Sequence, residues 1–180
     1  FKVCISSEML LNQKGLSGEA AAEMISIDKK LIKKFITAKT EYTIENANQI
    51  TLFPDVAEVI FKLRKNNYKV WIFTSAPRDF VLKVMNNFQE LKKAIGNNVV
   101  WREMYKESKP SPKVLNVTLE KMGLKNSQVY YVGDAASDYK TSLNANVKFI
   151  YFCPNLKQRD ARIPESVPIV FSHREIWRWL

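Results

Sequence analysis

The sequence has few of the residues that build metal and disulfide sites. Its 180 residues include two cysteines, Cys4 and Cys153, and one histidine, His173. Two isolated cysteines make no disulfide framework, and a single histidine argues against a zinc site. We therefore expect a protein of a reducing intracellular compartment, either the cytoplasm or an organelle matrix.

Long hydrophobic runs are also missing. No stretch approaches the about 20 consecutive apolar residues that a membrane span needs, so we expect no membrane partner. Apolar residues still make up 46% of the chain and aromatic residues 12%. That is enough to fill the core of one domain with a small insertion.

Basic residues are in excess, and the formal net charge is +10. Such a charge favours anionic partners, such as nucleic acid or phosphorylated ligands, although it can also serve solubility alone. Four lysines lie about one turn apart on a predicted amphipathic helix: Lys29, Lys30, Lys33 and Lys34. They are candidate contacts for RNA or protein partners, for example in a ribonucleoprotein or another large assembly.

Predicted strands and helices alternate along the chain. Apolar runs predict strands at residues 1–5, 68–73, 98–105, 127–133 and 147–152. Helical spacing and capping residues predict helices at 17–47, 54–67, 78–95, 111–123, 138–146 and 172–180. Within 17–47, Ser17 can cap a first segment and Asp28 a second, and Gly123 is expected to end the helix at 111–123. The strands are apolar throughout, which is typical of a parallel sheet covered on both faces, so we predict an α/β fold.

Ligands in such folds bind beyond the carboxyl ends of the strands. Thr74 and Ser75 follow one predicted strand there and offer hydroxyl groups, and Lys109 offers a compact charge for phosphate oxygens. Asp134 and Asp138, four residues apart, are carboxylates of the kind that Mg²⁺ prefers. Together these residues predict a site for metal-assisted phosphoryl transfer.

Three segments that carry these residues, VWIFTSAP, ESKPSP and YYVGDAASD, occur in this order. They resemble motifs II, III and IV of the haloacid dehalogenase (HAD) superfamily, and most closely its phosphoglycolate-phosphatase-like branch. The resemblance implies a Rossmann-like core, a parallel sheet flanked by helices, formed by residues 1–13 and 50–180. It also implies a small helical cap insertion at 14–49.

The same resemblance implies Mg²⁺-dependent hydrolysis of phosphomonoesters through an aspartyl-phosphate. Thr74, with Ser75 beside it, would bind the transferring phosphoryl group, and Lys109 would steady that group and the nucleophile. Asp134 would hold the metal, supported by Asp138.

The first motif departs from the family pattern. That motif is Asp-x-Asp at the end of the first strand, yet the first 27 residues contain no aspartate. The register that we prefer keeps residues 3–5 as the strand and places Ser6 and Glu8 at the two aspartate positions. The other register places Ile5 and Ser7 there.

A serine without a neighbouring base is a poor nucleophile, so the chain is predicted to have lost phosphatase catalysis and to retain at most a weakened Mg²⁺ site. It would then act as a binding or scaffold module that holds a phosphorylated small molecule or nothing at the old site. The alternative is an active Mg²⁺-dependent phosphomonoester hydrolase with a non-standard first motif.

Overall fold

The computed structural model describes residues 1, 3–6, 9, 13 and 15–180, which form two compact units. Unit 1 comprises residues 1–33 and 107–180, and unit 2 comprises residues 34–106. Each unit has its own hydrophobic core. The predicted division into a core and a cap follows other boundaries and stays a prediction.

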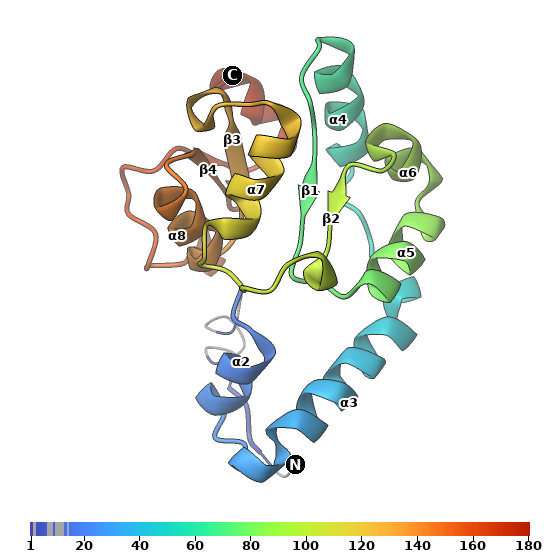
Figure 1. The fold of residues 1–180 in the computed structure, drawn as a ribbon, viewed down its shortest axis with the longest axis vertical. Coiled ribbons are helices and arrows are strands. Elements are labelled where there is room, and N and C mark those ends of the chain that lie inside the picture. The colour runs from blue at the N-terminus through green and yellow to red at the C-terminus, as the bar shows by residue number, and fades with distance from the viewer. Residues whose placement is uncertain (2, 7–8, 10–12, 14) are drawn as a thin grey trace. The chain divides into compact units, whose positions relative to one another are not determined.

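Unit 1 contains a three-stranded parallel sheet in the order β3-β4-β5. Its strands are β3 (Tyr130–Gly133), β4 (Lys148–Phe152) and β5 (Ile169–Val170). The helices of this unit are α2 (Gly18–Met24), α7 (Lys113–Met122) and α8 (Ala136–Asn144). Its 3₁₀ turns are Lys29–Leu31, Asn126–Gln128, Leu156–Gln158 and His173–Arg178. The chain therefore alternates β3, α8 and β4, as expected of a parallel sheet (Figure 1).

Both faces of β4 are buried, because successive strand side chains point to opposite faces of the sheet. Phe149 and Tyr151 pack in one cluster with Ala136 of α8. Ile150 and Phe152 pack in another cluster with Ile176, from the turn near the carboxyl end of the chain. The prediction of apolar strands covered on both sides, and with it the α/β fold, is confirmed.

Unit 2 has two short parallel strands, β1 (Ile72–Phe73) and β2 (Val99–Val100). Its helices are α3 (Ile32–Glu45), α4 (Val56–Lys65), α5 (Arg78–Asn87) and α6 (Gln89–Ile95). Helix α3 begins two residues before the unit boundary. The 3₁₀ turns of this unit are Ala47–Gln49 and Arg102–Met104. The core gathers buried side chains from α4, α5, α6 and β2, namely Ile60, Val81, Met85, Leu91, Ala94, Ile95 and Val99. Among the described residues of both units, no helix is long and apolar enough to cross a membrane.

Polar side chains begin the predicted helical segments as expected. The Ser17 hydroxyl accepts from the backbone N–H of Ala20 at 3.2 Å at the start of α2. The Asp28 carboxylate accepts from the N–H of Lys30 at 2.8 Å, one turn before α3. At the other end of a helix, Gly123 ends α7 in the left-handed conformation (φ 65°, ψ 31°), which costs glycine little.

The predicted opening strand is wrong. Residues 3–6 belong to no strand, and Cys4 and Ile5 are exposed to solvent. The Ser6 hydroxyl, where the strand was expected to deliver its motif, accepts from the N–H of Met9 at 3.1 Å. Ser7 and Glu8, which belong to the two registers of that motif, lie outside the described residues.

Two other expectations are corrected. The single helix predicted at 78–95 is interrupted at Phe88, whose backbone (φ −121°, ψ 79°) separates α5 from α6. The predicted helix at the carboxyl end is a 3₁₀ turn whose Ser172 side chain makes no capping bond. There, Glu175 accepts from the N–H of Phe171 at 3.3 Å, because its side chain reaches back beyond the expected capping position.

Candidate functional site

A buried ion pair lies at the carboxyl end of β3 in unit 1. Lys109 Nζ donates to Asp138 Oδ1 at 2.5 Å, and the two side chains are 10% and 6% exposed. The Tyr131 hydroxyl donates to the same oxygen at 2.8 Å, and the N–H of Ala135 donates to Oδ2 at 3.2 Å. The structure thus brings together Lys109 and Asp138, both predicted from the sequence, and adds Tyr131, which was not.

Gly133 allows the strand and the helix to approach closely at this point. A Cβ atom at this position would lie 2.5 Å from the Cβ of Asp138, well inside van der Waals contact. Glycine has no Cβ, so the first turn of α8 can fold back onto the end of β3. The glycine of the GDAASD segment is therefore required by packing against Asp138.

The hydrogen bonds around Asp138 decide whether the buried pair is tolerated. Removing two charges from water costs several kcal/mol per ion, and the ionic attraction offsets this only with good geometry and further hydrogen bonds. Tyr131 and the Ala135 amide supply those bonds to both carboxylate oxygens. Tyr131 is thus a residue of the candidate site that sequence reasoning missed, since its place in an apolar strand gave no sign of a polar role.

The predicted Mg²⁺ ligands have unlike surroundings. Asp134 is exposed at the end of β3, whereas Asp138 is buried with donors on both of its oxygens. In the described part of the chain, no group of three His, Cys, Asp or Glu side chains is placed to hold a metal ion. The described side chains therefore do not by themselves fit a magnesium site.

The predicted phosphate-binding hydroxyls lie in unit 2, at the end of β1. The N–H of Thr74 donates to the Val100 carbonyl at 2.9 Å, which extends the β1–β2 ladder by one bond. The Thr74 hydroxyl accepts from the N–H of Ala76 at 3.1 Å, and the Tyr105 hydroxyl donates to the Thr74 carbonyl at 3.1 Å. Thr74 and Ser75 are both partly buried in this turn.

Two backbone N–H groups after β1 have partners within unit 2. The N–H of Ala76 donates to the Thr74 hydroxyl. The N–H of Arg78, the first residue of α5, donates to Glu103 Oε2 at 3.0 Å. Glu103 therefore places a negative charge at a helix N-terminus, where the helix dipole favours it.

Tyr105 makes the stability of unit 2 depend on pH. Burial raises the pKa of Tyr105 above its ordinary value, and the Ser75 hydroxyl offsets part of that effect. A raised folded-state pKa means that the stabilisation is present below the unfolded pKa of about 10 and is lost as the pH rises through the folded value.

We expect Tyr105→Phe to lose about 0.5–1.5 kcal/mol at pH 7, because the hydrogen bond to Thr74 is removed. Stability should then fall less steeply with pH above about 10 than in the parent chain. Urea unfolding between pH 7 and 11 measures both effects. Tyr42→Phe, at a side chain that is 68% exposed on α3, is the matched control. If the free energy of unfolding fell equally steeply above about pH 10 in both variants, the prediction would be contradicted.

Lys109→Met should destabilise the chain by about 3–5 kcal/mol, because it leaves the Asp138 carboxylate buried without its counter-ion. The double variant Lys109→Met/Asp138→Leu should be more stable than Lys109→Met, since no isolated charge remains. Urea unfolding at pH 7 provides the comparison. Lys113→Met, whose exposed ion pair with Glu107 is open to water, should change little. A double variant no more stable than Lys109→Met would refute this account of the pair.

Comparisons with known proteins agree with the fold. The sequence profile of the family "Haloacid dehalogenase-like hydrolase" matches residues 1–152. The chain is 27% identical over 117 residues to the phosphoglycolate phosphatase of Aliivibrio fischeri, a match that covers 64% of this chain and 51% of that protein. It is 25% identical over 135 residues to the phosphoglycolate phosphatase of Vibrio parahaemolyticus, covering 72% and 58%. The chain thus spans about half the length of the curated relatives it matches.

Solved structures share the fold at low sequence identity. A predicted phosphoglycolate phosphatase from Haemophilus somnus superposes with a TM-score of 0.79 at 21% identity, covering 99% of this chain and 84% of that one. CbbY from Rhodobacter sphaeroides, solved in complex with phosphate, gives 0.77 at 16% identity, covering 97% and 82%. The profile match over most of the sequence shows the relationship: the chain belongs to the haloacid dehalogenase-like hydrolase family.

Proposed function

We propose that this chain binds a small phosphate monoester at the carboxyl end of β3, through Lys109, and that its 180 residues do not hydrolyse that ligand by themselves. The observation that carries the proposal is the buried Lys109–Asp138 pair, which holds an ammonium group at a fixed place near the carboxyl end of β3. Membership of a hydrolase family whose curated relatives act on phosphoglycolate supports a phosphorylated ligand.

Lys109 can bind a phosphate oxygen while it remains paired with Asp138. An ammonium group has three N–H donors, and they need not all serve one carboxylate. Asp138 keeps the ammonium in one place, and Tyr131 and the Ala135 amide keep the carboxylate in place in turn. The ligand therefore meets an ammonium group whose position is already fixed. This lowers the entropic cost of ordering the Lys109 side chain when the ligand binds.

Hydrolysis requires a nucleophile, which a serine hydroxyl supplies only when a base activates it. The Ser6 hydroxyl is exposed and accepts a hydrogen bond from Met9. Residues 1, 3–6 and 9 contain no carboxylate at all. The described part of the opening segment thus supplies no nucleophile of the kind that the family uses.

The alternative is an active Mg²⁺-dependent phosphomonoester hydrolase, and it is favoured by the activity of the curated relatives. It needs a carboxylate nucleophile, either from Glu8 or from polypeptide beyond these 180 residues. Its substrate would be a small phosphorylated carboxylate, the chemical class of the relatives' substrate. In this alternative, Lys109 and Asp134 keep the roles that the family motifs imply.

A scaffold role in a ribonucleoprotein or another assembly rests on charge. Lys29, Lys30, Lys33 and Lys34 are all exposed, so they are open to an anionic partner. Binding through such a surface would weaken steeply with added salt. The lysines carry no chemistry that selects RNA over another polyanion, and this role therefore stands behind phosphate binding.

Inorganic phosphate should bind the parent chain, and Lys109→Met should weaken that binding by at least about tenfold, because a charge-assisted hydrogen bond is lost. Isothermal titration with and without Mg²⁺ measures the affinity, and circular dichroism checks that each variant is folded. Lys113→Met is the control, because it also removes one positive charge but at an exposed ion pair. Equal affinity in all three chains would overturn the proposal.

The 180-residue chain should not turn over p-nitrophenyl phosphate with Mg²⁺, and Ser6→Asp/Glu8→Asp should gain no activity. The reason is that residues 3–6 form no strand to carry a nucleophile. Release of p-nitrophenol measures turnover. Activity in the parent chain that disappears in Lys109→Ala and Asp134→Ala would establish the alternative. Activity gained by Ser6→Asp/Glu8→Asp would contradict this prediction and support the register that places Ser6 and Glu8 at the aspartate positions.

A further inference from the structure

A second carboxylate, Asp160, lies at the start of α8, although it belongs to none of the motifs. It comes from the loop between β4 and β5, and its Oδ2 accepts from the N–H of Ala136, the first residue of α8, at 3.3 Å. The Asp160 side chain is 11% exposed. The start of the helix that carries Asp138 is thus held by a residue 24 positions away from Ala136 in the chain.

Arg162 binds the Asp160 carboxylate through two nitrogens of its guanidinium group. Its Nε donates to Oδ1 at 2.8 Å and its Nη2 to Oδ2 at 2.7 Å, while its backbone N–H donates to Oδ1 at 3.0 Å. A two-point contact of this kind fixes the orientation of the carboxylate as well as its position. The oxygen that accepts from Ala136 is therefore not free to rotate away.

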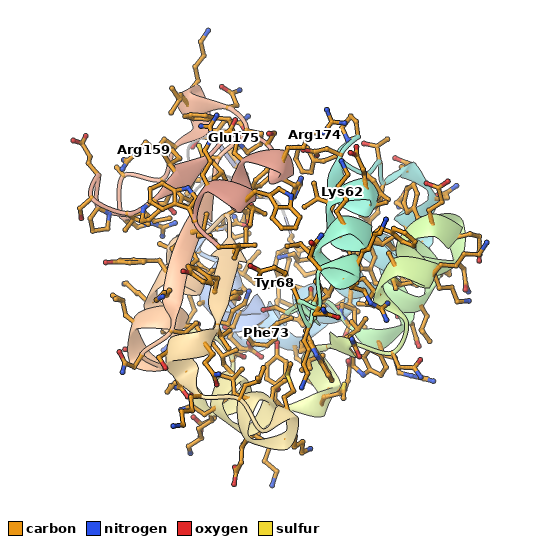
Figure 2. The ribbon with its side chains drawn as sticks, turned by 90° about the horizontal axis from the view of Figure 1, so that it is seen from above. Lys62, Tyr68, Phe73, Arg159, Arg174 and Glu175 are labelled. Atoms are coloured by element: carbon orange, nitrogen blue, oxygen red, sulfur yellow. The ribbon has the colours of Figure 1, made fainter. Side chains whose placement is uncertain are left out.

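The backbone of the same loop is anchored in the core of unit 1. The N–H of Asp160 donates to the hydroxyl of Tyr151 at 2.8 Å, and Tyr151 is buried in β4. Arg159, labelled in Figure 2, donates from Nη2 to the carbonyl of Ile163 at 2.9 Å, and Ile163 is fully buried. Asp160 is thus fixed both through its main chain and through its side chain.

The Asp160 carboxylate is charged at neutral pH. Burial raises the pKa of Asp160, but the hydrogen bonds from Arg162 and from the Ala136 amide outweigh burial, so the pKa lies below its ordinary value. A negative charge at a helix N-terminus is stabilising, because the first amides of the helix point toward it. The first turn of α8 is therefore held between two carboxylates, its own Asp138 on Ala135 and Asp160 on Ala136.

We infer that Asp160 is a positioning residue for the Lys109–Asp138 pair, and that Arg162 holds it in that role. By fixing the amide of Ala136, Asp160 sets the first turn of α8, and that turn sets where Asp138 places the Lys109 ammonium. The effect on phosphate binding rests on the function proposed above, whereas the coupling between Asp160 and Lys109 does not.

The first test measures that coupling without any ligand. A double-mutant cycle combines Asp160→Asn with Lys109→Met in urea unfolding at pH 7. Positioning predicts that the unfolding equilibrium constant of the double variant departs by at least about threefold from the product of the two single effects, since coupled residues are not additive. Effects that simply multiply would overturn the inference. Glu165→Gln, at an exposed carboxylate in the same loop, is the control and should show no coupling to Lys109→Met.

The second test follows the amide of Ala136 and the affinity for inorganic phosphate. Asp160→Asn should speed hydrogen exchange at the Ala136 amide by about tenfold or more, as expected for loss of a charged acceptor, and should weaken phosphate binding. Arg162→Lys should act in the same direction, because lysine cannot make the two-point contact. Faster exchange with unchanged phosphate affinity would show that Asp160 caps α8 without positioning Lys109 for phosphate, and would overturn that part of the inference. A parent chain that binds no phosphate would refute the proposed function while leaving the coupling test intact.

Discussion

The ion pair between Lys109 and Asp138 is the interaction on which the carboxyl end of β3 depends. Two buried charges at 2.5 Å are stable only if their remaining hydrogen-bonding capacity is met inside the protein. The nearby features follow from that requirement. Gly133 leaves room for the carboxylate, and Tyr131 and the Ala135 amide donate to it. The Lys109 ammonium is thus held in place through Asp138 and the groups that donate to that carboxylate.

Both candidate strand ends use their own polar groups before any ligand arrives. In unit 2, the Thr74 hydroxyl accepts a hydrogen bond from the N–H of Ala76, and Glu103 accepts one from the N–H of Arg78. In unit 1, Asp138 takes the amide of Ala135. At each of these strand ends, taken by itself, the named amides already have acceptors within their own unit. A phosphate bound at either one would therefore depend more on side-chain cations than on these amides.

The sequence predicted those parts of the fold that depend on local patterns. The unbroken apolar run of β4 indicated a strand buried on both faces, and Ser17 and Gly123 marked helix ends correctly. The opening run of residues 1–5 has the same apolar character, yet its described residues, 1 and 3–5, belong to no strand. A short apolar run does not by itself show whether another strand will pair with it. At the candidate site, the motifs indicated Lys109 and Asp138, whereas Asp160 became visible only through tertiary contacts.

The division into two units has a consequence for biosynthesis. Unit 2 is one continuous stretch, residues 34–106, so all of its strands and helices leave the ribosome together and can pack as soon as they emerge. Unit 1 is assembled from residues 1–33 and 107–180, which more than seventy intervening residues separate. Its first segment must wait, without the rest of its unit, until residues 107–180 have been made. Over that interval Ala21 and Ala22, which are buried in the folded chain, lie on a helix segment that lacks the rest of its unit.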